Sequence, residues 1–288
     1  MKYVLIADSG STKTDWLGME VGVGEILRFS TAGMNPFFQL SDDMETTLCE
    51  VRERWDSELG TIRYPEAVFF YGAGCTAEKK LQVRNAILKV LDSSHVEVES
   101  DLMGAARALC GKTEGIACIL GTGSNSCLYD GQEIVSNISP LGFILGDEGS
   151  GAVLGKLWIA DVLKHQQPED LCRKFLEHYD LTLADIIEKV YRQSFPNRFL
   201  AGFSPFLREH LSEPTVRQLV VGAFEAFFRR NVMQYEQYKH CPVHFTGSVA
   251  YYFREILVET AASLGISTGE ILRSPLEGLM AYHTVLNH

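Results

Sequence analysis

The chain lacks several features that would place it in common protein classes. Its 288 residues contain no run of about 18 apolar residues, the length that a membrane-spanning helix needs. Its net charge is −11 without a visible basic cluster, which argues against a nucleic-acid or membrane partner. Only the five apolar residues 3–7 precede Asp8, too few for the apolar core of a secretion signal. We therefore expect a cytoplasmic protein.

Paired cysteines and metal-binding histidines are also lacking. The seven cysteines form no CxxC pair, and this odd, scattered set is typical of reduced thiols in a cytoplasmic protein. The eight histidines show no ligand spacing. We expect no zinc site.

The Walker A motif is missing too, but two other glycine-rich and hydroxyl-rich hairpins are present. One follows the apolar segment 3–7, the other follows the apolar segment 116–120, and a further predicted strand comes after each. Small residues let backbone N–H groups approach an anion, and hydroxyls add donors for phosphate oxygens. Each hairpin alone could be an ordinary polar turn. Together they predict a binding site in which both hairpins contact one nucleotide. The candidate residues are Ser9, Gly10, Ser11, Thr12, Lys13 and Thr14 in the first hairpin and Gly121, Thr122, Gly123 and Ser124 in the second.

Two acidic residues stand where predicted strands end. Asp8 is suited to hold Mg²⁺ through water, although it could instead cap a turn. Asp101 lies between the predicted strand 96–100 and a helix, so its carboxylate could accept a proton from a substrate hydroxyl. A helix N-cap is the alternative role for Asp101.

Two further segments carry candidate ligand contacts. Asp147 and Glu148 lie in a glycine-dense stretch and could bind sugar hydroxyls or a metal, or favour the N-terminus of the following helix. Gly247 and Ser248 form a strand-to-helix turn where an adenine or ribose could lie on the backbone, although such a turn could be a generic junction.

Strands and helices alternate, which predicts an α/β fold, and the opening pattern recurs in the second half. We expect two lobes, 1–104 and 105–288, with the last helix packing on the first lobe. The predicted strands are 3–7, 15–20, 25–31, 66–71, 96–100, 116–120, 125–130, 133–136, 243–246 and 270–273. The predicted helices are 41–59, 77–91, one from 102, 150–164, 168–178, 182–193, 203–211, 214–238, 248–264 and 275–287.

The order of these motifs resembles the BadF/BadG/BcrA/BcrD-type ATPase family, and within it the N-acetylglucosamine kinases of the actin/Hsp70/sugar-kinase superfamily. The motifs are Asp8…Thr14, Gly33…Asn35, Tyr71–Cys75, Ser100–Asp101, Gly121…Asn125, Gly146–Gly149, Thr246–Val249 and Pro275–Gly278. The resemblance covers essentially the whole chain. One departure is that Ser9 and Ser11 stand where the family carries glycines.

This resemblance implies two ribonuclease-H-like lobes around a nucleotide cleft. It implies an ATP site formed by both hairpins with Gly247 and Ser248, and Asp101 as general base. A sugar site would use Asn35, Gly72, Asp101, Thr122, Asn125, Gly146 and Asp147. The implied reaction is transfer of a phosphoryl group from ATP, with Mg²⁺, to an amino sugar, most simply to the 6-hydroxyl of N-acetylglucosamine.

Two alternatives stay open at this stage. A related ATPase could activate an iron–sulfur enzyme, although that role needs converging cysteines and those here are isolated. A sugar or nucleotide sensor without catalysis is the other. A homodimer is also open, because the residues do not fix the oligomeric state.

Overall fold

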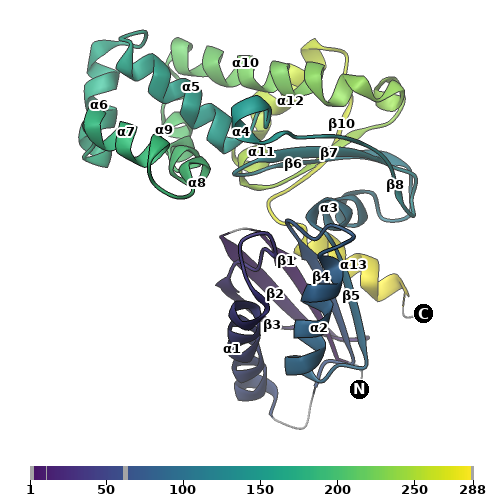
Figure 1. Cartoon of the computed structure of the whole chain (residues 1–288). Coiled ribbons are helices and arrows are strands. Elements are labelled where there is room, and N and C mark those ends of the chain that lie inside the picture. Colours follow the sequence, from purple (N-terminus) through teal and green to yellow (C-terminus); the bar gives the residue numbers. More distant parts are fainter. Residues whose placement is uncertain (1–2, 11, 61–63, 287–288) are drawn as a thin grey trace. The chain divides into compact units, whose positions relative to one another are not determined.

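The computed structural model describes residues 3–10, 12–60 and 64–286, which form two compact units (Figure 1). The first unit runs to Thr113 and also holds Gly131–Glu133 and the segment from Ser274 onward. The second unit consists of Glu114–Asp130 and Ile134–Arg273. The first unit extends past residue 104 because the helix that begins at Asp101 packs on its sheet.

The first unit is built on one five-stranded sheet in the order β3-β2-β1-β4-β5. Its strands are β1 (Tyr3–Ser9), β2 (Lys13–Glu20), β3 (Gly24–Ala32), β4 (Ala67–Gly72) and β5 (His95–Ser100). β1 is antiparallel to β2 and parallel to β4, and β4 is parallel to β5. The register places Ser9 beside Gly72 and Gly72 beside Ser100, so three strands end together at one edge of the sheet.

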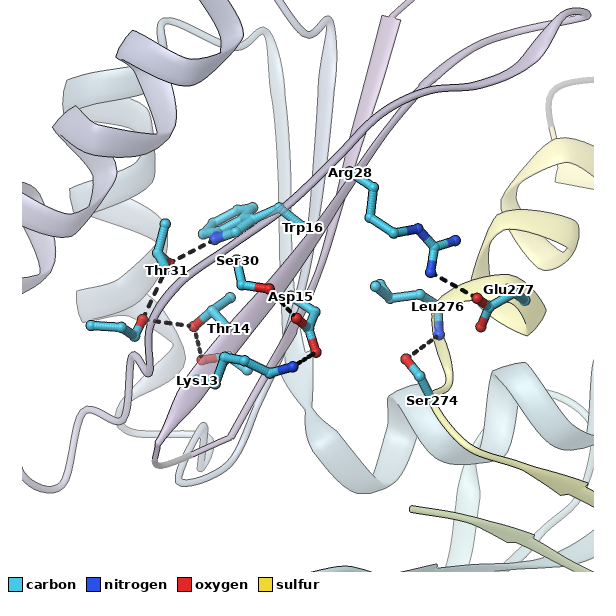
Figure 2. A network of polar contacts seen from close by, with 12 residues as sticks. Lys13, Thr14, Asp15, Trp16, Arg28, Ser30, Thr31, Ser274, Leu276 and Glu277 are labelled. Atoms are coloured by element: carbon cyan, nitrogen blue, oxygen red, sulfur yellow. Dashed lines mark hydrogen bonds and ion pairs between the residues drawn. The ribbon is translucent and has the colours of Figure 1, made fainter. Parts of the chain in front are cut away.

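Helices cover both faces of this sheet (Figure 1). They are α1 (Ser41–Leu59), α2 (Lys80–Leu91), α3 (Asp101–Cys110) and α13 (Leu276–Leu286). Successive side chains of β1 alternate between faces, so Leu5 packs in the cluster with α1 and α2. Val4 faces Leu276 and Leu279 of α13 on the other side. An ion pair of 2.7 Å between Arg28 and Glu277 also ties α13 to β3 (Figure 2).

The sheet of the second unit repeats the topology of the first. Its order is β10-β9-β6-β7-β8, formed by β6 (Gly115–Leu120), β7 (Ser124–Tyr129), β8 (Ile134–Ile138), β9 (Val243–Thr246) and β10 (Thr268–Leu272). Read from the other edge, the order is β8-β7-β6-β9-β10, which corresponds strand by strand to β3-β2-β1-β4-β5 of the first sheet. The corresponding pairs are also parallel or antiparallel in the same way. The prediction of an α/β fold with two related sheets is confirmed.

The helices of the second unit bury a large aromatic core. They are α4 (Gly142–Leu145), α5 (Gly151–Leu163), α6 (Glu169–Tyr179), α7 (Leu183–Tyr191), α8 (Pro196–Ala201), α9 (Ser204–Glu209), α10 (Pro214–Arg230), α11 (Ser248–Tyr252) and α12 (Arg254–Ser263). Two short 3₁₀ helices, η1 (Val232–Gln234) and η2 (Glu236–Lys239), follow α10. None of the helices in the described part of the chain combines the length and apolarity needed to cross a membrane.

Two helices differ from the sequence-based prediction. The helix predicted over 214–238 ends at Arg230, where the side-chain amide of Asn231 donates to the carbonyl oxygen of Phe227 at 3.3 Å. Such a local bond competes with continuation of the helix. The helix predicted over 248–264 is divided at Phe253, whose ring is buried in the core. Both α4 and α8 were missed by the prediction.

Gly155 allows α5 to pack closely on α8. A Cβ atom at this position would lie 1.9 Å from the carbonyl oxygen of Leu200. We expect Gly155→Ala to lower the free energy of unfolding by about 3 kcal/mol, measured by urea denaturation, because backbone must move to admit the methyl group. The control is Gly222→Ala in α10, where no atom lies within 4 Å. This control should raise stability by about 0.5–1 kcal/mol, and equal effects of the two changes would contradict the packing argument.

Candidate active site

Two carboxyl groups lie at the edge where β1 and β5 end. Asp8 precedes the last residue of β1, and Asp101 follows the last residue of β5. Burial raises the pKa of Asp8 to about 7, and the nearby negative charge of Asp101 adds to this rise. Burial also raises the pKa of Asp101. Because two like charges held close together favour a cation or a hydroxyl proton between them, the pair is suited to hydrated Mg²⁺ and to proton transfer.

Helix capping does not explain Asp101. The N-cap of α3 is Ser100, whose hydroxyl accepts a hydrogen bond of 3.1 Å from the N–H of Met103. Asp101 is the first helical residue, and its Oδ1 accepts from the N–H of Leu102 at 2.8 Å. The alternative in which Asp101 serves as the N-cap is therefore wrong.

The first hairpin is braced by two buried hydroxyls. The hydroxyls of Ser9 and Thr14 lie 2.7 Å apart, and the N–H of Met34 donates to both, at 3.1 and 3.2 Å. Thr14 also donates to the carbonyl oxygen of Ala32 at 3.2 Å, and the neighbouring Trp16 donates to Thr31 at 2.9 Å (Figure 2). The side chains of Ser9 and Thr14 thus fix the loop after β3.

The tip of this hairpin contains the residues that remain accessible. Gly10, Thr12 and Lys13 are exposed, and the N–H of Gly10 donates to the carbonyl oxygen of Lys13 at 2.9 Å. The Lys13 ammonium lies 2.8 Å from the carboxylate of Asp15 (Figure 2). Ser11, predicted to bind phosphate, lies outside the described residues. A phosphate here would therefore meet the backbone of the tip and the Lys13 side chain.

Asn35 and the end of β4 come together on the same unit. The buried Asn35 accepts from the N–H of Phe37 at 3.0 Å through Oδ1. A Cβ atom at Gly74, where φ is +79°, would lie 2.3 Å from this oxygen. At Gly72 a Cβ atom would lie 2.6 Å from the ring of Phe70, so close packing explains that glycine. Burial and the charge of Asp101 raise the pKa of Cys75 to about 12, so Asp101 adjoins the same loop.

The second hairpin is fastened to the first turn of α5. The N–H of Gly151 donates to the carbonyl oxygen of Gly121 at 2.8 Å, and that of Ala152 donates to Thr122 at 3.1 Å. Within the hairpin, the N–H of Gly121 donates to Gly123 at 2.9 Å. These bonds hold the hairpin against the start of α5.

Asp147 contacts this hairpin directly. Its Oδ1 accepts from the N–H of Ser124 at 3.2 Å, and burial raises its pKa. The residue has a φ of +54°, and its N–H donates to Pro140 at 2.8 Å. Gly146 is needed beside it, because a Cβ atom there would lie 2.1 Å from the carbonyl oxygen of Pro140. Asn125 is engaged differently, since its Oδ1 accepts from the side chain of Asn137 at 2.9 Å.

Gly247 lies between β9 and α11, beside the second hairpin. Its φ is +115°, and a Cβ atom would lie 2.4 Å from the carbonyl oxygen of Leu120. Only glycine fits this close approach of two backbones. Gly121 of the hairpin and Ser248 of the turn line the same cavity.

A cavity of about 400 Å³ opens beside this hairpin and this turn. Its lining includes Gly121, Thr122, Ser204, Arg208, Ser248 and Tyr252. Tyr252 is 36% exposed, and the guanidinium of Arg208 lies 4.6 Å from the centroid of its ring. Within the described chain, the Ser204 hydroxyl is buried and has no hydrogen-bond partner. An aromatic wall, one cation and glycine backbone suit a nucleotide.

Sequence reasoning missed Ser204, Arg208 and Tyr252. They lie on the short helices α9 and α11, about 40 residues apart in the sequence, and no motif marks them. The sequence places Ser204 and Arg208 shortly before the long helix α10, and Tyr252 shortly after a predicted strand. These positions do not distinguish the three residues from other surface residues.

Comparison with solved structures gives matches over nearly the whole chain. A proposed N-acetylglucosamine kinase from Porphyromonas gingivalis is 52% identical, with a TM-score of 0.94, and the match covers 99% of this chain and 100% of that one. A proposed N-acetylglucosamine kinase from Chromobacterium violaceum is 16% identical, with a TM-score of 0.78 and coverage of 98% and 99%. A ROK-family glucokinase from Streptomyces griseus, solved with glucose and AMPPNP, is 15% identical, with a TM-score of 0.61 and coverage of 98% for both chains. The last two matches show the shared fold alone. No protein-family model and no curated protein matches this chain.

Proposed function

Because the chain belongs to the N-acetylglucosamine kinase-like family, as its 52% identity to the Porphyromonas gingivalis protein shows, we propose that it is an ATP-dependent amino-sugar kinase. The acceptor in this proposal is the 6-hydroxyl of N-acetylglucosamine, and the enzyme acts in the cytoplasm. The observation that carries the proposal is the pair of carboxyl groups, Asp8 and Asp101, at the edge where β1 and β5 end.

Asp101 acts as the general base. Its carboxylate takes the proton of the acceptor hydroxyl while the hydroxyl oxygen forms a bond to the γ-phosphorus of ATP. The bond between that phosphorus and the bridging oxygen breaks, and ADP leaves. Little further covalent chemistry is needed, because phosphoryl transfer depends mainly on positioning and on neutralising charge.

The remaining roles are divided among the two hairpins and their neighbours. Asp8 would hold Mg²⁺ through water, and this ion neutralises charge on the phosphates when it is bound. The tips of both hairpins would hold the phosphates, and the cavity beside Gly247 and Ser248 would take the nucleoside against Tyr252. The sugar would contact Asn35 and Asp147, with Gly72, Thr122, Asn125 and Gly146 shaping its surroundings.

The cysteines do not favour the alternative of an activator of an iron–sulfur enzyme. Five of the seven are buried, and burial raises the pKa of Cys75, which opposes the thiolate form that binds iron. Within the described residues, no group of three or more histidine, cysteine or acidic side chains is placed to hold a metal ion. No observation favours a sensor without catalysis.

The test is an ADP-release assay with four acceptors, N-acetylglucosamine, glucosamine, N-acetylmannosamine and N-acetylmuramic acid. We expect the highest kcat/KM with N-acetylglucosamine, and a product whose phosphate is coupled to the 6-position protons by NMR. Release of ADP with none of the four sugars would contradict the kinase. A higher kcat/KM with another sugar would change the acceptor and keep the reaction class.

A further inference from the structure

A second groove of the second unit lies next to the cavity described above. Its volume is about 650 Å³, and its lining includes Arg208, Arg217, Tyr251, Tyr252, Arg254 and Glu259. Arg208 and Tyr252 line both hollows, whereas Arg217, Tyr251 and Arg254 line only the groove. The groove therefore has a wall of its own and shares one side with the candidate nucleotide cavity.

The groove gathers positive charge in a chain whose net charge is −11. Arg217 pairs with Glu259, which leaves Arg208 and Arg254. Neither of these two arginines forms an ion pair with any residue in the described ranges. They lie over tyrosine rings instead, with Arg208 4.6 Å from the ring centroid of Tyr252 and Arg254 5.3 Å from that of Tyr251. Stacked guanidinium groups keep their N–H donors free for anionic oxygens.

The first turn of α12 adds a second contribution. Phe253 is the N-cap of this ten-residue helix, and the first-turn residues Arg254, Glu255 and Ile256 all line the groove. The N–H groups of a first helical turn have no partner within the helix and carry partial positive charge. Glu255 opposes this field, so an anion would lie toward Arg254 and Arg208.

We propose that this groove binds a phosphate-bearing small molecule at the same time as the nucleotide cavity is filled. The two arginines and the start of α12 would hold the phosphate, and Tyr251 would pack against the rest of the ligand. Because Arg208 and Tyr252 border both hollows, binding in the groove would change nucleotide affinity. A sugar phosphate and a second nucleotide both carry a phosphate and an adjoining group that could pack on Tyr251, so either could be the ligand. The inference rests on the groove and on the nucleotide site of the proposed function, and not on transfer of a phosphoryl group.

The experiment is calorimetric titration of the full chain after its nucleotide cavity has been saturated with AMPPNP. The probes are pyrophosphate, N-acetylglucosamine 6-phosphate and ADP, and the strongest of the three identifies the source of the phosphate. We expect one further saturable binding event. Its affinity should fall at least tenfold when the salt concentration is raised from 0.05 to 0.5 M, because salt screens the charges of an exposed site and the Debye length is already about 10 Å at 0.1 M.

The matched variants are Arg254→Gln and Arg229→Gln. Both arginines are exposed, but Arg229 lies on α10 outside the groove. Arg254→Gln should weaken the further event at least tenfold with an unchanged Tm, and Arg229→Gln should leave it within twofold. The proposal is overturned if none of the probes binds beside AMPPNP, if the probes only displace AMPPNP, or if both variants bind alike. Any of these results leaves the ADP-release assay unaffected, so failure of the groove and failure of the kinase are distinguishable.

Discussion

Asp101→Asn is expected to lower kcat of N-acetylglucosamine phosphorylation by about 10²–10⁴-fold, the range that a positioned general base contributes. The asparagine keeps the size of the side chain and can still accept from the N–H of Leu102, which now donates to Asp101 at 2.8 Å. It cannot take the proton of the acceptor hydroxyl. Affinity for AMPPNP should stay within twofold, because in the proposed mechanism Asp101 contacts the sugar and not the nucleotide.

Ser100→Ala is the matched control for this change. It removes the N-cap of α3, whose hydroxyl accepts from Met103, and should cost about 1 kcal/mol of stability. Turnover should change little, because the carboxylate of Asp101 stays in place. The two variants are compared by steady-state kinetics and by urea denaturation. If Ser100→Ala reduced kcat as strongly as Asp101→Asn, the position of the helix and not the carboxylate would control the rate.

This contrast between Ser100 and Asp101 illustrates what a sequence can resolve. The strand before these residues and the helix after them were predicted from hydrophobic pattern, and the structure confirms both elements. Either Ser or Asp can cap a helix, so composition alone left the role of Asp101 open. The structure excludes the N-cap role because Ser100 is the N-cap of α3, and the role of Asp101 as general base stays a prediction.

In the first hairpin, the sequence predicted the turn but not the orientation of its side chains. Its glycine and hydroxyl pattern correctly marked a turn between two strands, yet the pattern does not say which hydroxyls face outward. Ser9 and Thr14 pair across the β1–β2 ladder and contact the loop at Met34, 20 to 25 residues away. Tertiary contacts of this kind leave no local signal. For the same reason Arg208 and Tyr252, from helices α9 and α11, could not be assigned to one cavity from the sequence.

Asp8→Asn is expected to change activity and stability in opposite directions. Activity should fall by about 10–100-fold, the usual cost of losing a partner of a metal-bound water. Stability at pH 8 should rise, because the folded protein holds a carboxylate where burial and the charge of Asp101 oppose ionisation. An asparagine of the same size carries no such charge. A structural role alone would move both readouts in the same direction.

The pH dependence follows from the raised pKa of Asp8, about 7 in the folded chain against 3.8 ordinarily. Between these values the folded chain binds the proton of this group and the unfolded chain does not. The free energy of unfolding of the wild type should therefore fall as pH rises from about 4 to 7, and level off above 7. Without solvent screening, this rise in the pKa of Asp8 would correspond to about 4 kcal/mol of unfolding free energy. Since Asp8 is half-buried and partly screened by solvent, we expect Asp8→Asn to gain about 1–2 kcal/mol at pH 8 and nothing near pH 4.

Asp15→Asn is the matched control for Asp8→Asn, because Asp15 lies directly opposite Asp8 in the β1–β2 register. Its carboxylate pairs with the exposed Lys13, so its loss should change stability by less than about 0.5 kcal/mol. Urea denaturation at pH 4, 6 and 8, with and without Mg²⁺, measures the effect. Added Mg²⁺ should stabilise the wild type and the Asp15 variant at pH 8 more than it stabilises Asp8→Asn, since the proposed ion compensates the charges of both Asp8 and Asp101 and this variant keeps only that of Asp101. An equal response of all three proteins to Mg²⁺ would remove Asp8 from the metal site, even if the variant were inactive.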